Sequence, residues 1–145
     1  MIAIADTNVI LRTIITDDNE EQAAAAAAAL KSAEKIVVPI IAFCEVAWIL
    51  RSKYKRDTKS FIAAALRIIL NNPKVVADTD AVLAGLQMAD AGGDFADGVM
   101  QHLGSRLADA PGVFLSFDRN AVKRLTARGI AASIPTAPAP AKQRK

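Results

Sequence analysis

The chain has 145 residues, a net charge of +3 and 52% hydrophobic residues, which suits a single domain with a well-filled core. Its single cysteine, Cys44, excludes a disulfide framework within the chain and fits a reducing cytoplasm, where we expect the protein to reside. No apolar stretch reaches the roughly 20 residues that cross a bilayer, and no basic segment typical of a signal peptide is present, so we expect no membrane association.

The first part of the chain reads as a strand followed by a helix. Residues 1–5 are predicted to form a short buried strand. Asp17, Asp18 or Asn19 can cap the helix that follows, because side-chain oxygens of these residues accept hydrogen bonds from the first free amides. The alanines 23–29 continue this helix, since alanine is the strongest helix former.

The remaining chain keeps this alternation. The predicted elements are strand 35–39, helix 41–54, a helix from 56–60 to 71, strand 75–77, helix 79–91, helix 94–109, strand 113–117 and helix 120–127. This order predicts an α/β fold of three layers, with a central, mostly parallel twisted sheet between helices. We expect residues 1–134 to form the domain and residues 135–145, which are rich in proline, to be a disordered tail.

Acidic residues stand at the carboxyl ends of predicted strands. Asp6 ends the first strand and Asp118 the last, while Asp94 and Asp97 lie in the first turn of a helix and project from the same side. Sites in open parallel sheets form beyond the carboxyl ends of the strands, so these acids could converge on one rim. Each of them alone could equally be a favourable acid at a helix start.

Glu45 interrupts an apolar helix. Ile41, Trp48 and Ile49 surround it at three- and four-residue spacing, which predicts a buried face. A carboxylate buried there must be paired, bound to metal or protonated, because an isolated buried charge is costly. A structural ion pair in the core therefore stays open as an alternative to a metal ligand.

The acids as a group indicate a hard divalent cation. Clustered carboxylates repel one another, and a proton or a cation must relieve that repulsion. Oxygen ligands favour Mg²⁺ or Mn²⁺, and one histidine, His102, and one cysteine make a zinc site a poor fit. Carboxylate-bound Mg²⁺ suits phosphodiester hydrolysis, because it polarises phosphoryl oxygens and acidifies a bound water.

Basic residues near these acids suggest where a nucleic acid could lie. Arg51 and Lys55 stand at the end of one predicted helix, and Arg119 and Lys123 in the last helix. Phosphate contacts from these side chains would position an RNA strand and make its binding steeply dependent on salt. Ordinary solvated surface remains the alternative for each of them.

Four motifs carry a resemblance to a known family. In order and spacing, "ADTNVILR", "FCEVAWILRSKY", "DFADGVM" and "LSFDRNAVK" resemble the PIN-domain ribonuclease toxins of VapC type over residues 1–130. The resemblance implies a PIN-like fold and a Mg²⁺- or Mn²⁺-dependent endoribonuclease that cuts structured transfer or ribosomal RNA and so inhibits translation. It also implies a homodimer and a cognate antitoxin, a DNA-binding protein of VapB type.

The resemblance further implies the site residues. The catalytic acids fall on Asp6, Glu45, Asp97 and Asp118, all as metal ligands, with Asp94 as a supporting ligand. Thr7, Asn8 and Ser116 are implied to orient these carboxylates, with Ser116 standing where the family usually has threonine. Gly98 follows Asp97 at a position where alanine is more usual.

Two other functions stay open. A phosphoryl-accepting α/β domain also places an aspartate at a strand end, although a haloacid-dehalogenase-like phosphatase needs a second aspartate where Asn8 stands. A catalytically weak interaction module could use the acidic pocket to receive a partner's arginine. A test for aspartyl phosphate identifies the first, and metal binding without RNA cleavage identifies the second.

Overall fold

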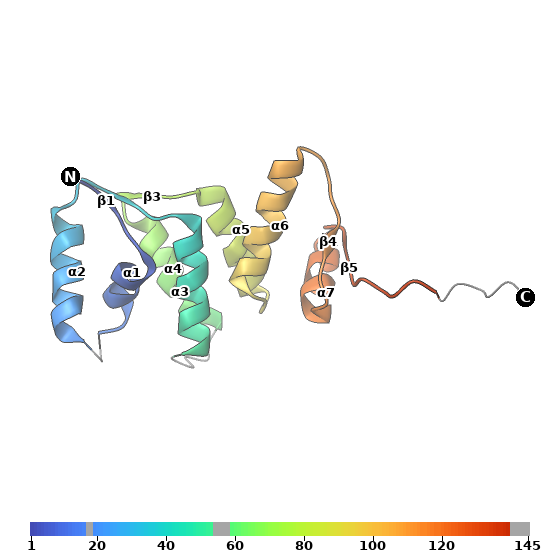
Figure 1. Cartoon of the computed structure of the whole chain (residues 1–145), viewed down its shortest axis with the longest axis horizontal. Helices are drawn as coiled ribbons and strands as arrows, with labels where there is room; N and C mark the ends of the chain where they lie inside the picture. Colours follow the sequence, from blue (N-terminus) through green and yellow to red (C-terminus); the bar gives the residue numbers. More distant parts are fainter. Residues whose placement is uncertain (17–18, 54–58, 140–145) are drawn as a thin grey trace, which may run out of the picture.

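The computed structural model describes residues 1–16, 19–53 and 59–139, and it confirms the predicted α/β class (Figure 1). The elements are β1 (Ile2–Ile4), α1 (Thr7–Ile14), α2 (Glu20–Ser32), β2 (Lys35–Val37), α3 (Ile40–Ser52), α4 (Lys59–Asn71), β3 (Val75–Val76), α5 (Thr79–Asp90), α6 (Phe95–Ala108), β4 (Phe114–Leu115), α7 (Arg119–Ala127) and β5 (Ala132–Ser133). Among the described residues, no helix is both long and apolar enough to cross a membrane.

The strands form two parallel sheets rather than the single central sheet expected from the sequence. One has the order β1-β2-β3, with Ile4 opposite Val37 in its register, and the other pairs β4 with β5. Figure 1 shows β4, β5 and α7 near the end of the molecule that is far from β1, with α6 in between. The described sheet is therefore interrupted between β1 and β4.

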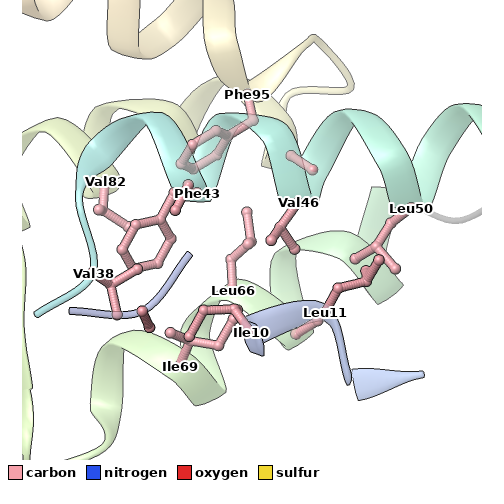
Figure 2. Close-up of a cluster of buried hydrophobic side chains, with 14 of the residues drawn as sticks. Ile10, Leu11, Val38, Phe43, Val46, Leu50, Leu66, Ile69, Val82 and Phe95 are labelled. Atoms are coloured by element: carbon pink, nitrogen blue, oxygen red, sulfur yellow. The ribbon is translucent and has the colours of Figure 1, made fainter. Parts of the chain in front are cut away.

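The core lies between α3, α4 and the three-stranded sheet. Phe43, Val46 and Leu50 of α3 are almost fully buried and face Leu66 of α4. Figure 2 shows these side chains meeting those of α1, α5 and α6 and Val38, which follows β2, in one cluster. Burying each large apolar side chain contributes about 1.5–3 kcal/mol, so this cluster fixes how α3 presents its opposite, exposed side.

Helix α6 packs closely against α5 because glycine stands at the contact. A Cβ atom built on Gly98 would lie 2.5 Å from the carbonyl oxygen of Ala84 and 2.8 Å from Cβ of Met88. Both distances are far shorter than van der Waals contact, so only glycine permits this approach. Gly98 thereby positions the first turn of α6, which carries Asp97, against α5.

Several local features differ from the sequence-based expectations. Helix α1 is not among the predicted elements, and it forms because Asp6 caps it and Ile10 and Leu11 bury its inner side. Strand β4 is shorter than the predicted 113–117, and β5 was not predicted. Asn19 caps α2, as one of the three candidates, while Asp17 and Asp18 lie outside the described residues, as do residues 140–145 of the predicted tail.

Candidate functional site

Three of the candidate acids begin helices. Asp6, Asp94 and Asp118 are the N-cap residues of α1, α6 and α7. Their Oδ1 atoms accept hydrogen bonds of 2.9–3.2 Å from the backbone amides of Val9, Ala96, Asn120 and Ala121. Such bonds from helix amides hold a carboxylate in one orientation. Because Oδ1 makes the cap in each case, Oδ2 is the oxygen that can face a ligand.

Glu45 is tied to the end of β1 through Thr7. The Thr7 hydroxyl donates a hydrogen bond of 2.5 Å to Oε2 of Glu45, and Thr7 directly follows Asp6 in the chain. The predicted burial of Glu45 is wrong: Ile41 and Trp48 on its side of α3 are 66% and 67% exposed. The cost of burying a charge therefore does not arise, and Glu45 needs no ion pair in the core.

Several neighbouring charges influence the pKa of Asp97. Partial burial raises the pKa of its carboxyl group, and the nearby Asp94 and Asp118 raise this pKa further. Arg51 acts in the opposite direction and lowers the pKa of Asp97. Asp94 and Asp118, at the starts of α6 and α7, therefore act electrostatically on Asp97, and Arg51 at the end of α3 opposes them.

The charges of both Asp94 and Glu45 act on the thiol of Cys44. The thiol is half-buried, and its pKa is raised to about 11 by burial and then by the charges of Asp94 and Glu45. With that pKa the free thiol stays protonated at neutral pH and is a poor nucleophile. Its place next to Glu45 in the sequence was the available signal that it borders the site.

Ser116 contacts the backbone of one candidate acid, Asp118. Its Oγ accepts a hydrogen bond of 3.0 Å from the backbone amide of Asp118, which supports the turn into α7. Asn8 is exposed in the first turn of α1. Of the basic candidates, Arg119 and Lys123 are exposed on α7, whereas Lys55 lies outside the described residues.

The donor set fits a hard cation, although the acids do not yet enclose one. Across residues 1–16, 19–53 and 59–139, no group of three or more His, Cys, Asp or Glu side chains is arranged to hold a metal ion. Asp6 directly precedes Thr7, which donates a hydrogen bond to Glu45. The donors are nevertheless carboxylate oxygens, and a cation would relieve the repulsion that raises the pKa of Asp97.

Comparison with known families identifies the family of the chain. A model of the PIN domain matches residues 3–124, a span that includes all five candidate acids and helices α1 to α6. No curated protein matches the sequence. PIN domains are typically nucleases that depend on a divalent metal. Since the match covers most of the chain, this protein belongs to the PIN domain family.

Proposed function

We propose that this chain is the toxin of a type II toxin–antitoxin system of VapC type. In this proposal it is a Mg²⁺- or Mn²⁺-dependent endoribonuclease that hydrolyses phosphodiester bonds in structured transfer or ribosomal RNA and so inhibits translation. The observation that carries the nuclease is the match of the PIN domain to residues 3–124, within which the charges of Asp94 and Asp118 raise the pKa of the partly buried Asp97. Three carboxylates that repel one another are poised to gain most from a divalent cation.

The chain's own residues have distinct roles in this proposal. Asp97 and Asp118 hold the cation, with Asp94 beside them, and Asp6 and Glu45 complete the ligand set from the end of β1 and from α3. When bound, the cation stabilises charge on the phosphoryl oxygens and acidifies a water molecule. Thr7 keeps Glu45 in place through its hydrogen bond, and Ser116 supports the backbone of Asp118.

Basic residues beside the acids support an RNA substrate. Arg51 lies close enough to Asp97 to lower its pKa, so its guanidinium can contact a phosphate adjacent to the one that is cleaved. Arg119 directly follows Asp118, and Lys123 lies one turn further along the exposed side of α7. These contacts position the RNA backbone, while base selection requires other groups.

The nuclease is tested with purified protein, a mixture of transfer and ribosomal RNA, and Mg²⁺. We expect site-limited cleavage that chelation of the metal abolishes. Asp97→Asn and Asp118→Asn should lower the rate by about 100-fold or more, because each removes charge that holds the cation. Glu21→Gln on α2 is the matched control, since it removes an exposed acid outside the site. Full activity in both aspartate variants would rule out this site.

The toxin role predicts a protein partner. Ile41 and Trp48 form an exposed apolar surface on the side of α3 that carries Glu45, where an antitoxin segment could cover the acids. Expression of the chain alone should arrest growth, and co-expression of the small DNA-binding protein encoded next to it should restore growth. If the expressed protein cleaves RNA but growth is unimpaired, the nuclease activity is supported and the toxin role is contradicted.

A further inference from the structure

Strand β1 has an open edge made by two exposed isoleucines. The Ala5 amide donates to the carbonyl of Val37 at 3.0 Å, which directs the backbone groups of Ala5 toward β2. Neighbouring residues in a parallel strand point these groups to opposite sides, so Ile2 and Ile4 direct theirs away from β2. The side chains of Ile2 and Ile4 are 61% and 76% exposed. This edge therefore offers unpaired hydrogen-bonding groups beside apolar surface.

Strand β4 and the residues after it have an open edge of the same kind. The amides of Phe114 and Ser116 donate to β5 carbonyl groups at 3.0 and 3.2 Å. By the same alternation, Leu115 and Phe117 direct their backbone groups away from β5. Leu115 is 62% exposed and Phe117 is 80% exposed. An open apolar edge is a template for another strand, so each of these edges can pair with a strand of another chain.

The two edges fit each other in register. In a parallel pair, a residue that points toward the neighbouring strand lies opposite a residue that points away from it. Ile4 can therefore lie opposite Ser116, and this register places Asp6 opposite Asp118. Leu115 then falls on the same face as Ala3, which offers little bulk. The pairing would satisfy both edges and close the gap in the sheet.

The chain's own β4 is held away from its own β1. Arg124 donates from Nε to the carbonyl oxygen of Ala91 at 3.0 Å, and Arg128 donates to Oε1 of Gln87 at 2.6 Å. These bonds fasten α7 to the end of α5 and to the turn after it. Figure 1 shows α6 between β4 and β1 along the length of the molecule. The chain's own β4 is therefore not the neighbour of β1, and a second copy carries the same strand.

We propose that two copies of this chain exchange their β4–α7–β5 segments, so that β4 of each pairs in parallel with β1 of the other. The exchange joins the two sheets in the order β3-β2-β1-β4-β5 and makes a closed, two-fold dimer. It also brings the partner's Asp118 beside Asp6, since the two follow the paired strands in this register. The consequence for cleavage rests on the proposed nuclease function, whereas the pairing of the strands does not.

The pairing is tested by disulfide trapping between two kinds of chain. Both carry Cys44→Ala, and one also carries Ile4→Cys and the other Ser116→Cys. Opposite residues of paired strands lie about 5 Å apart, within the range that a disulfide spans. We expect a 4–116 cross-linked dimer, identified by mass spectrometry. Leu115→Cys in place of Ser116→Cys is the matched control, because its side chain faces the other side of the sheet.

Two results would overturn the exchange. One is the absence of any 4–116 disulfide in the mixture, and the other is a chain carrying both cysteines that closes the bond within itself. Sedimentation of the unmodified protein gives an independent measurement: we expect a dimer, which Ile4→Pro separates into monomers and Ile4→Val leaves intact. The amide of Ile4 points out of the sheet, so proline there spares the bonds between β1 and β2. A monomeric native chain contradicts the proposal.

Complementation tests the shared site. Chains with Asp6→Asn and chains with Asp118→Asn are unfolded, mixed in equal amounts and refolded together. With exchanged segments, half of the dimers are mixed and each of these has one site with both acids intact, so about a quarter of native cleavage should return. If both acids of a site come from one chain, the mixture stays inactive. Should the native protein cleave no RNA, the proposed function fails while the cross-link still decides the exchange.

Discussion

The hydroxyl group of Thr7 donates a hydrogen bond of 2.5 Å to Oε2 of Glu45, which joins the first turn of α1 to the middle of α3. The two residues are far apart in the sequence, and each adjoins another residue of the site. Thr7 follows Asp6, and Glu45 follows Cys44, whose thiol is close to Asp94. This bond therefore ties the residue after Asp6 to the helix that carries both Glu45 and Cys44.

Thr7→Val should lower RNA cleavage by about 10-fold or more, as expected when a group that orients a metal ligand is lost. The bond is exposed to solvent, so the free energy of unfolding should fall by less than about 1 kcal/mol. Thr7→Ser keeps the hydroxyl and should retain most activity. Cleavage rates and thermal unfolding of both variants test this prediction. Equal cleavage rates for Thr7→Val and the native protein would contradict the role of Thr7 in orienting Glu45.

Gly98→Ala should lower the free energy of unfolding by about 1–3 kcal/mol, because the new methyl group would collide with the Ala84 backbone and Met88. Gly104→Ala is the control in the same helix, where no atom lies within 4 Å of the added Cβ. Removing a helical glycine there should leave stability unchanged or raise it by up to about 1 kcal/mol. Urea unfolding of both variants measures the difference, and similar effects at the two positions would mean that α6 does not approach α5 so closely.

Asp97 should make stability depend on pH. Its pKa is higher in the folded chain than in the unfolded one, so the folded state binds the proton more tightly. Without metal, the native protein should therefore lose stability as pH rises from the ordinary aspartate pKa through the raised one. Because the carboxyl group is partly exposed, we expect only about 0.5 kcal/mol after allowance for solvent screening. Asp97→Asn should lack this loss, and parallel stability curves for the two proteins would contradict it.

Mg²⁺ should reverse the destabilising effect of the clustered acids. At about 100 times its dissociation constant, a cation that binds only the folded state adds about 2.7 kcal/mol to the free energy of unfolding. The melting temperature of the native protein should rise with Mg²⁺ at constant ionic strength. Asp97→Asn and Asp118→Asn should respond far less, whereas Glu21→Gln should respond normally. If the melting temperature of the native protein does not change with Mg²⁺ or Mn²⁺, the metal site is contradicted.

Arg51→Gln should shift the acidic limb of the pH profile of cleavage to higher pH. Arg51 lowers the pKa of Asp97, so its loss lets Asp97 keep a proton at higher pH, where it no longer attracts a cation. The slope of RNA binding against salt should also fall by about one phosphate contact. Lys53→Gln, two residues later at the end of α3, is the control and should leave the acidic limb in place.

The class of fold was predictable because strands and helices alternate with clear signals. The alanine run after Asn19 and the glycines before α6 mark helix boundaries through local chemistry alone. Helix α1 was harder to predict, because its valine and isoleucines favour strands as much as helices. The separation of β4 from β1 depends on tertiary contacts such as that of Arg124 with Ala91, which no local pattern encodes.

The candidate residues follow from their positions in the sequence, whereas their geometry depends on the fold. Position at strand ends and helix starts indicated Asp6, Asp94, Asp97 and Asp118. The exposure of Glu45 was not predictable from helical spacing, because Ile41 and Trp48 are apolar residues that the fold leaves on the surface. The closeness of Arg51 to Asp97 depends on how the end of α3 meets α6, which the sequence does not show.

The three capping carboxylates serve two purposes with one side chain each. Asp6, Asp94 and Asp118 start their helices whether or not they ever meet a metal ion. A duplicated copy of this gene that had lost its substrate would still be selected to keep them, because losing a cap costs about 1 kcal/mol. Retention of these aspartates in a relative is therefore no proof of activity there. Retention of Asp97, which lies inside the first turn of α6 and not at its N-cap, is a better indicator of activity.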